Sequence, residues 1–452
     1  MNHTIKNIIG FILLSAALFA FVQQKKESSY SPVLEEPFEK VMARDKSQKA
    51  AVMKRHMDLL NDRYDLSKKV TTEVLMSRGK PLPVGPTAKL KNGVTWETLA
   101  RMSPEKIKEQ NIFPFLPLPH PNHATGGMVF TQIQIEKFPR LERFDMDFDL
   151  PEYFMPEYPP ALFLTTHKAM GDVSQGQIIS IDNYYDLFNG ILNPKQLEGL
   201  RLLVTQFPQQ QFNSTADRKS EKPSLGVTCF DCHVNGHTSG ATHLVGDIRP
   251  QSHRNRIETP TLRGVNIQHL FGSQRALKTI EDFTEFEQRA AYFDGDHLNA
   301  AKKGVNVLER GSQVHFMAEF QALLDFPPAP KLDIYGRLDY AKATDSEKRG
   351  EKIFFGKAKC ATCHDAPYYT DNQMYDLQVE RFYQSQTIQD QYIRAEGPMK
   401  TFPLRGIKDS PPYLHDGRLL TLEDVVEFFN LVQQLNLSSA EKKDLTAFLR
   451  QL

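Results

Sequence analysis

All four cysteines of the chain lie in two Cys-x-x-Cys-His motifs, at residues 229–233 and 360–364. Two thiols at this spacing reach the two vinyl groups of one porphyrin, and the next residue places an imidazole beneath the iron. A zinc site would require converging Cys pairs and would leave the repeated His unexplained. A thioredoxin-like pair would not occur twice with His in the same place. The motifs predict two covalent haem c groups, attached through Cys229, Cys232, Cys360 and Cys363, with His233 and His364 as proximal ligands.

Composition narrows the class of protein around these motifs. The 452 residues include 55 Lys and Arg and 55 Asp and Glu, so the formal net charge is zero. Nucleic-acid binders and polybasic membrane-surface proteins need excess positive charge, and we therefore expect no nucleic-acid partner. A mean hydropathy of −0.45 argues against a polytopic membrane protein. The length corresponds to two or three domains.

The N-terminus resembles an export signal. Lys6 precedes an apolar run from Ile8 to Val22, and polar residues follow at Gln23. A short basic start, an apolar stretch of about 15 residues and small residues near its end are typical of a secretory signal. We interpret residues 1–27 as a signal peptide, with an uncleaved membrane anchor as the alternative. The expected location is the periplasm.

The two haem regions are internal copies. When Thr259 is aligned with Thr401, an offset of 142 residues, ten of the 30 positions in 259–288 and 401–430 are identical without a gap. A repeat of this length indicates duplicated domains rather than a solenoid. Shared helical periodicity alone would not produce the common Leu-Arg-Gly segments at 262–264 and 404–406.

Helix signals lie around each motif. Thr344 with Glu347 and Ser438 with Glu441 are capping boxes. Thr279 and Thr421 precede acidic first turns, which favour the positive end of the helix dipole. Four further segments carry secondary-structure signals: a charged helix over 35–63, a helix from Asn193-Pro194 to Leu203, a short strand over 129–135, and a final helix with an apolar face.

These signals predict a mainly α fold. It consists of two tandem cytochrome c-like haem domains, at 195–343 and 344–452, related by internal duplication. An irregular α and loop extension with little strand occupies residues 28–194, and we expect its many Pro and aromatic residues to pack over the haem domains.

The C-terminal 250 or so residues resemble the bacterial di-haem cytochrome c peroxidase and MauG family, as a divergent member with a long N-terminal extension. The matching segments are Gly350-x-x-Ile353-Phe354, Tyr369-Thr370-Asp371, Pro403-Leu404-Arg405-Gly406, Pro411 to Arg418, and Leu422-Glu423, with a weaker match from Cys229 to Leu262. Longer di-haem relatives such as rubber oxygenases also carry large N-terminal additions.

The resemblance implies that one haem, usually the first, reacts with peroxide or dioxygen and that the other passes electrons. The second haem of the family takes a Met or Tyr as its sixth ligand, and Phe429 stands at that position here. His415 is the best candidate replacement, with Met374 and Met399 behind it. A hydrogen-bonding role for His415 weighs equally.

Other family positions also differ. The Trp expected between the haems falls at Ser273, the distal Gln at Phe283, and the distal Glu near Phe293. Phe283, Glu287 and Asp294 are therefore the candidate catalytic residues, because peroxide cleavage needs a group that moves a proton. An apolar Phe283 would instead favour dioxygen or an apolar substrate. His243 or His253 are alternatives that would close the first haem.

The resemblance further implies a calcium ion between the haems and arginines on the haem propionates. The calcium ligands would be the Glu258 side chain and the carbonyls of Ser410 and Pro412. Arg263 and Arg405 would bind propionates, since guanidinium pairs bidentately with carboxylates.

The expected function is that of a di-haem c-type oxidoreductase. The cofactors would be two haem c groups and one Ca²⁺. The partners would be hydrogen peroxide or dioxygen and an electron donor, either a small redox protein or a quinol-linked system, with a homodimer left open. The alternatives are an oxygenase resembling the rubber-cleaving enzymes and a non-catalytic electron-transfer cytochrome.

Overall fold

The structure is a computed structural model that describes residues 38–119, 128–142, 149–206, 227–243, 256–272, 275, 277–287, 310–388, 391–392 and 396–452. The signal segment 1–27, Ser273, His253 and Asp294 lie outside the described residues, as does the side chain of His243. In the described part the chain is mainly helical with short strands, as the sequence predicts. Within the same ranges, every helix is too short or too polar to cross a bilayer.

The helices fall into three groups along the chain. The extension contains α2 Phe38–Arg63, α3 Trp96–Ala100, α4 Pro104–Glu109, α5 Gln132–Lys137 and α6 Tyr184–Phe188. The first haem region contains α7 Pro194–Leu203, α8 Cys229–Cys232, α9 Ile280–Phe286 and α11 Arg310–Gln321. The second contains α12 Asp345–Phe355, α13 Leu422–Val432 and α14 Ser439–Leu449.

The strands of the described residues are short and form antiparallel sheets of two or three strands. They are β1 Val70–Leu75 with β2 Pro81–Pro83; β3 Met128–Val129, β4 Thr242–His243 and β5 Ile257–Glu258 in that order; β6 Met374–Tyr375 with β9 Met399–Lys400; and β7 Thr387–Ile388 with β8 Gln391–Tyr392. The strand predicted over 129–135 is wrong beyond Val129. Thr131 lies at the N-cap of α5, so the alternating segment turns into a helix instead.

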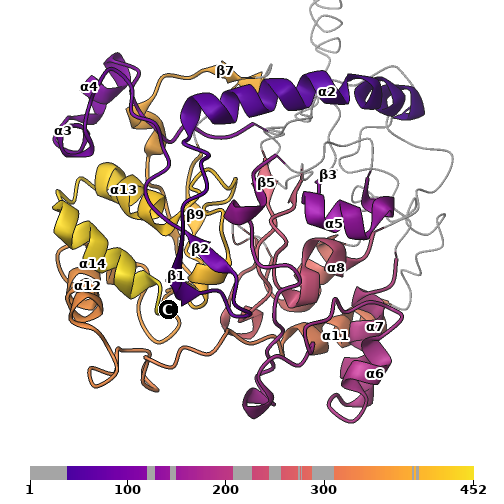
Figure 1. Cartoon of the computed structure of the whole chain (residues 1–452). Coiled ribbons are helices and arrows are strands. Elements are labelled where there is room, and N and C mark those ends of the chain that lie inside the picture. The colour runs from indigo at the N-terminus through magenta and orange to yellow at the C-terminus, as the bar shows by residue number, and fades with distance from the viewer. Residues whose placement is uncertain are drawn as a thin grey trace, which may run out of the picture.

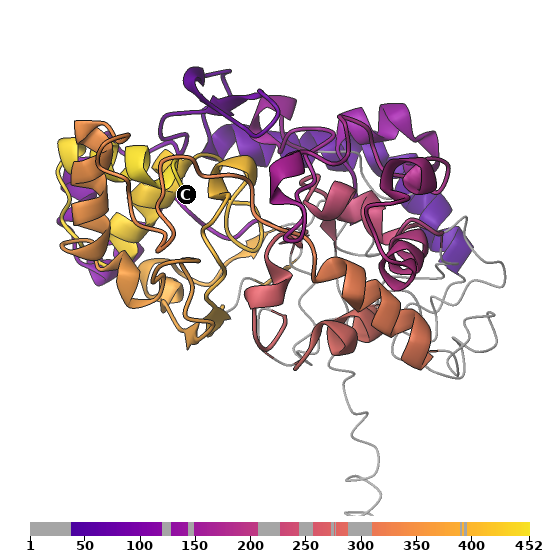
Figure 2. The ribbon, with the colours of Figure 1, turned by 90° about the horizontal axis from the view of Figure 1, so that it is seen from below.

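The haem regions form two lobes that lie side by side (Figure 1 and Figure 2). One lobe contains α7, α8, α9 and α11, and the other contains α12, α13 and α14. Helix α2 crosses above both lobes in Figure 1, whereas α6 of the extension lies at the lower right, beside α7. Phe115 of the extension is fully buried in the apolar core of the second lobe, so the extension is part of the packed structure.

Each lobe is held by a close crossing of its first and last helices. A Cβ atom on Gly199 of α7 would lie 1.8 Å from the carbonyl oxygen of Phe316 in α11. A Cβ on Gly350 of α12 would lie 2.0 Å from the carbonyl oxygen of Asp444 in α14. Real Cβ contacts are never this short, so both crossings require glycine. Gly350 lies in a segment that resembles the di-haem family, whereas the sequence analysis did not predict a role for Gly199.

The backbone confirms the internal duplication. Gly264 and Gly406 both have left-handed φ, at 73° and 74°, and each is followed by a short 3₁₀ helix, Val265–Ile267 and Ile407–Asp409. Isolated bridges then pair Phe271 with Leu277 and Tyr413 with Leu419, again at an offset of 142 residues. The turns that precede α9 and α13 therefore have the same geometry despite differing in sequence.

The predicted caps are also present. Thr279 and Thr421 each accept a hydrogen bond from the backbone of the residue three positions on, at the starts of α9 and α13. The capping boxes of α12 and α14, and a third at Asn193 before α7, each have both reciprocal bonds. Such caps are local, which is why the sequence alone located these helix starts.

The glycine crossings give a test of the fold. Gly199→Ala and Gly350→Ala are each expected to lower the free energy of unfolding by about 1–3 kcal/mol, because the added methyl group forces the helices apart. Gly311→Ala in α11 is the matched control, since nothing lies within 4 Å of a Cβ there. That helical change should stabilise by up to about 1 kcal/mol. Thermal unfolding of the three variants measures this, and equal effects at all three glycines would contradict the crossing argument.

Candidate functional site

The first Cys-x-x-Cys-His motif forms a single helical turn, α8, followed by His233. The Nδ1–H of His233 donates to the carbonyl oxygen of Pro260 at 2.9 Å, which leaves Nε2 as the unprotonated ring nitrogen. Burial lowers the pKa of His233 to about 4, so the imidazole is neutral. A neutral ring oriented by a backbone carbonyl is the state that a metal ligand requires.

The second motif repeats this arrangement. Cys360 to Thr362 form a 3₁₀ turn, and the Nδ1–H of His364 donates to the carbonyl oxygen of Tyr369 at 2.9 Å. Burial lowers the pKa of His364 as well. Tyr369 is itself fully buried and lies in the segment that resembles the di-haem family.

The donor set of both motifs fits haem c. No disulfide joins the four cysteines, and all four are half-buried. Each pair is followed by a neutral histidine whose Nε2 carries the lone pair. Within the described residues, no group of three or more His, Cys, Asp or Glu side chains is arranged to hold a metal ion.

The candidate distal residues of the first haem lie on α9. Phe283 is half-buried, with its ring centroid 6.3 Å from that of Phe271 and 6.4 Å from that of Phe286. Glu287 forms the C-cap of the same helix, and burial raises the pKa of its carboxyl to about 7. At the offset of 142 residues Glu287 corresponds to Phe429 of α13. The structure thus places Phe283 and Glu287 one helical turn apart.

His415 lies in the loop before α13 and is half-buried. Its Nε2 is 4.0 Å from Oε2 of Glu396, and its carbonyl oxygen accepts from the amide of Glu258 at 2.8 Å. The alternatives Met374 and Met399 lie on the paired strands β6 and β9, where Met374 faces Lys400 in the register. The sixth ligand of the second haem stays a prediction.

The two arginines assigned to propionates have protein partners. Nη1 of Arg263 is 3.0 Å from Oδ2 of Asp409, and Nη2 donates to the carbonyl of Ala161 at 2.6 Å. Nε of Arg405 donates to the carbonyl of Leu452 at 3.1 Å. Both guanidiniums are therefore oriented by the protein, and propionate binding stays a prediction.

The residues assigned to calcium come together in part. Glu258 is buried, and its Oε1 accepts from the Thr238 hydroxyl at 2.9 Å. Burial raises the pKa of Glu258 well above its usual value. Gly417 lies between Pro412 and Glu258, because a Cβ built on it would be 2.8 Å from Cγ of Pro412 and 4.0 Å from Cβ of Glu258. The carbonyl of Ser410 as a third ligand, and calcium binding itself, stay predictions.

The sequence analysis did not identify two groups of buried polar contacts that join the extension to the haem lobes. Arg256 forms a bidentate ion pair with Asp149, and Nε2 of His56 is 2.8 Å from the same carboxylate. Near the second group, the Tyr64 hydroxyl donates to the carbonyl of Arg418 at 2.8 Å. The backbone amide of Leu118 also donates to Oδ2 of Asp416 at 2.8 Å. Asp416 and Arg418 belong to the His-Asp-Gly-Arg segment, so the extension binds a segment that carries the family resemblance.

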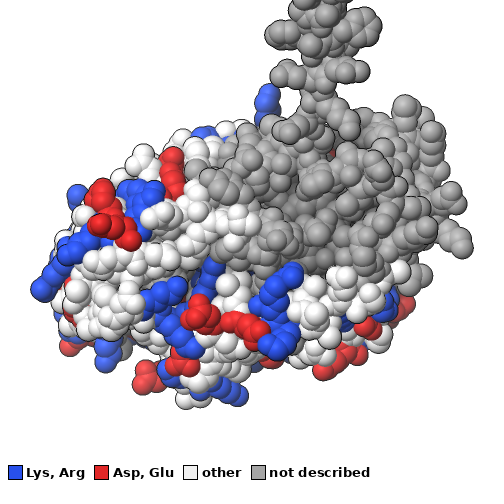
Figure 3. Space-filling view, turned by 90° about the horizontal axis from the view of Figure 1, so that it is seen from above, with Lys and Arg blue, Asp and Glu red and all other residues white. Residues whose placement is uncertain are grey.

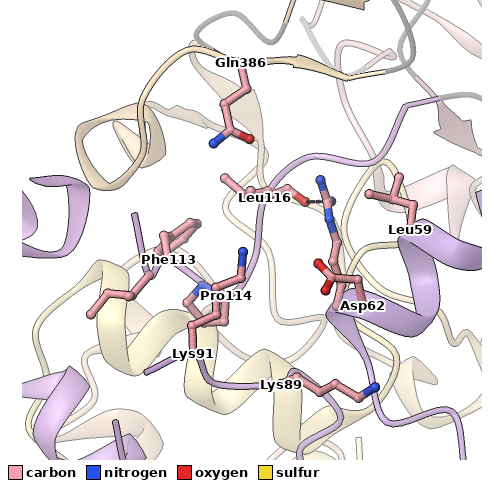
Figure 4. A pocket seen from close by; sticks show the side chains of 10 residues that line it. Leu59, Asp62, Lys89, Lys91, Phe113, Pro114, Leu116 and Gln386 are labelled. Atoms are coloured by element: carbon pink, nitrogen blue, oxygen red, sulfur yellow. Dashed lines mark hydrogen bonds between the residues drawn. The ribbon is translucent and has the colours of Figure 1, made fainter. Parts of the chain in front are cut away.

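A pocket of about 160 Å³ lies in the extension, at the end of α2 (Figure 4). It is lined by Leu59, Asp62, Arg63, Lys89, Lys91, Ile112, Phe113, Pro114, Leu116 and Gln386. In Figure 4, Gln386 enters from the side opposite Lys89 and Lys91. The haem motifs contribute nothing to its lining.

Comparison with known proteins agrees with the motifs, although no protein-family model matches the chain. Cytochrome-c peroxidase IdrP1 of Denitromonas iodatirespirans is 29% identical over 157 residues, which cover 25% of this chain and 42% of the peroxidase. IdrP2 of the same organism is 28% identical over 288 residues, covering 55% of this chain and 71% of that protein. Methylamine utilization protein MauG of Methylorubrum extorquens is 29% identical over 150 residues, covering 30% of this chain and 42% of MauG.

The match to IdrP1 and MauG thus spans less than half of their length. Among solved structures, a MauG-like protein associated with microbial copper homeostasis has a TM-score of 0.37 at 19% identity, covering 50% of this chain and 82% of that chain. The sequence similarity supports the haem c assignment that the two motifs predict.

The raised pKa of Glu287 predicts a pH dependence. Between the usual pKa of a Glu carboxyl, about 4.3, and the folded value of about 7, the unfolded chain is ionised while the folded chain keeps its proton. Stability should therefore fall as pH rises through this window and become level above it. In Glu287→Gln this loss should be absent. Unfolding temperatures of both proteins from pH 4 to 8 measure it, and parallel curves would show that Glu287 titrates normally.

Proposed function

Because the chain is a divergent homologue of the di-haem cytochrome c peroxidases and of MauG, we propose that it reacts with hydrogen peroxide or dioxygen at its first haem and transfers electrons through its second. The observation that carries the proposal is the pair of Cys-x-x-Cys-His motifs, each with a neutral histidine held through Nδ1. The relatives are 28–29% identical over 25–55% of this chain, so their substrates and electron donors are not carried over to it as established properties.

The residues of the first lobe have distinct roles in this proposal. When bound, the haem groups supply the redox-active irons. His233 would hold the iron through Nε2, while the carbonyl of Pro260 orients the ring through Nδ1. Phe283 and its aromatic neighbours exclude water from their side of α9. Glu287, whose pKa is about 7, can hold or release a proton at its carboxyl near neutral pH, as a general acid or base must.

His415 is proposed as the sixth ligand of the second haem. Phe429 cannot bind iron, and its ring packs against Phe428 with centroids 5.2 Å apart. His415 is half-buried in a loop. Its carbonyl oxygen accepts from the amide of Glu258 at 2.8 Å, and its Nε2 is 4.0 Å from Oε2 of Glu396. This anchoring supports a defined position for the imidazole, with Met374 and Met399 as the competing ligands.

The aromatic rings around Phe283 favour an oxygenase as the alternative function. An apolar wall suits dioxygen or an apolar substrate better than peroxide, as in an oxygenase resembling the rubber-cleaving enzymes. The rings of Phe271, Phe283 and Phe286 support this second function. A purely electron-transferring cytochrome is the third possibility, and it requires both irons to be six-coordinate.

The proposal includes an exported, periplasmic protein with a signal or anchor at residues 1–27. Calcium held by Glu258 with the carbonyls of Ser410 and Pro412 also belongs to it. Blue and red side chains are interspersed on the described part of the face in Figure 3. A redox partner, whether a small protein or a quinol-linked donor, would then dock through a local patch rather than through net charge.

Spectra of the purified di-haem protein test the function. We expect a high-spin ferric signal in the resting or half-reduced protein, and peroxide-dependent oxidation of a reduced donor. Glu287→Gln should lower kcat about 100-fold if its carboxyl moves the proton, while Glu281→Gln near the start of the same helix serves as the control. Two low-spin signals that persist after half-reduction would contradict both enzyme functions. Stable dioxygen binding without peroxide turnover would favour the oxygenase.

Replacing His415 tests the ligand assignment. In His415→Gly the low-spin signal of one haem should convert to a high-spin signal, because the iron loses an axial imidazole. His269→Gly is the matched control, since His269 is exposed and its backbone amide, which the substitution keeps, donates to Oδ1 of Asn372 at 3.1 Å. Electron paramagnetic resonance measures the change. An unchanged low-spin spectrum would show that His415 is not a ligand.

A further inference from the structure

A carboxylate lies inside the first haem motif, between its two cysteines. Asp231 is 5% exposed, and Arg140 binds it in a bidentate pair, with Nη1 2.8 Å from Oδ2 and Nη2 2.7 Å from Oδ1. The amide of Thr228 donates to the same Oδ2 at 2.7 Å. Bidentate guanidinium pairs of this geometry are the strong, directional ones.

Arg140 is supplied by the extension. It lies in a short 3₁₀ helix, Pro139–Leu141, that directly follows α5. Gln134 of α5 donates its side-chain amide to the carbonyl oxygen of Asp231, so the same segment binds both the side chain and the main chain of this residue. Leu141 and Gln134 are each 1% exposed, which anchors the segment against the first lobe.

The second motif has no counterpart of this pair. Thr362 stands at the position equivalent to Asp231, and it is exposed. The described part of the extension therefore neutralises a charge that only the first motif carries. The duplicated lobes share their backbone geometry but differ in this electrostatic feature, which is what separate roles for two haems would require.

We propose that Arg140 is a positioning residue that neutralises Asp231 and so keeps the reduction potential of the first haem more positive than the bare carboxylate would allow. Reduction adds one electron to the iron, and a nearby uncompensated anion disfavours that addition in a poorly solvated site. The inference rests on the proposed attachment of haem at Cys229 and Cys232 but needs no peroxide reactivity.

The test is a spectroelectrochemical titration of the full-length di-haem protein without peroxide. In Arg140→Gln one of the two potentials should become more negative, and in Asp231→Asn the same potential should become more positive. The double variant should return toward the wild-type value, and Arg140→Lys, which keeps the charge, should stay close to it. The other potential should not move in any of the four.

Arg349→Gln is the matched control. Arg349 makes a bidentate pair with Asp444 at 2.7 and 2.9 Å, between α12 and α14, and neither residue lies within a Cys motif. It should leave both potentials unchanged. Haem content is measured for each variant, and if Arg140→Gln fails to bind two haems, the Asp231→Asn result decides. Unshifted potentials in Asp231→Asn, or shifts of the same sign in both single variants, would overturn the proposal. Shifted potentials in a protein that ignores peroxide would overturn only the proposed function.

Discussion

One buried carboxylate connects the three parts of the chain. Asp409, in the second lobe, binds Arg263 of the first lobe and Ser77 of the extension, and its carbonyl oxygen accepts from Nε2 of His237 at 2.9 Å. Burial alone would raise the pKa of Asp409, but the cations of Arg263 and Lys408 lower it below its usual value. Removing one partner of such a pair leaves a buried charge uncompensated, at a cost of about 3–5 kcal/mol. The relative placement of the two lobes, and hence of their haem motifs, depends on this interaction.

The duplication explains why the lobes share a framework and differ in chemistry. The glycine crossings, the left-handed Gly264 and Gly406, and the capped helices α9 and α13 are backbone requirements, and both copies retain them. Side chains that the framework does not need have diverged, so that Glu287 stands opposite Phe429 in the alignment. A titratable group on one helix and an apolar ring on its copy are what a division between a reacting and an electron-passing haem would produce.

The sequence predicted features that depend on residues close together in the chain or on internal similarity. It did not predict contacts between residues far apart in the chain. The haem motifs, the caps at Thr344 and Ser438 and the duplication depend on residues close in sequence or on direct self-similarity, and the structure confirms the caps and the duplication. The partners of Arg256 and Asp231 could not be found in this way, because Asp149 and Arg140 lie 107 and 91 residues away. The strand predicted over 129–135 failed for the same reason, since tertiary packing of α5 against the first motif overrides a weak alternating pattern.

The extension gains a physical role from these long-range pairs. It provides Arg140 to a carboxylate in the first motif and Tyr64 to the backbone of Arg418 beside His415 in the second lobe. Each contact buries a polar group that the haem lobes could not satisfy by themselves, and an unsatisfied buried group is costly. Blue and red side chains are interspersed on the described part of the face in Figure 3, and the formal net charge of the chain is zero. Charges placed in pairs beside individual motifs can act on one haem without acting on the other, whereas a net charge would act on both.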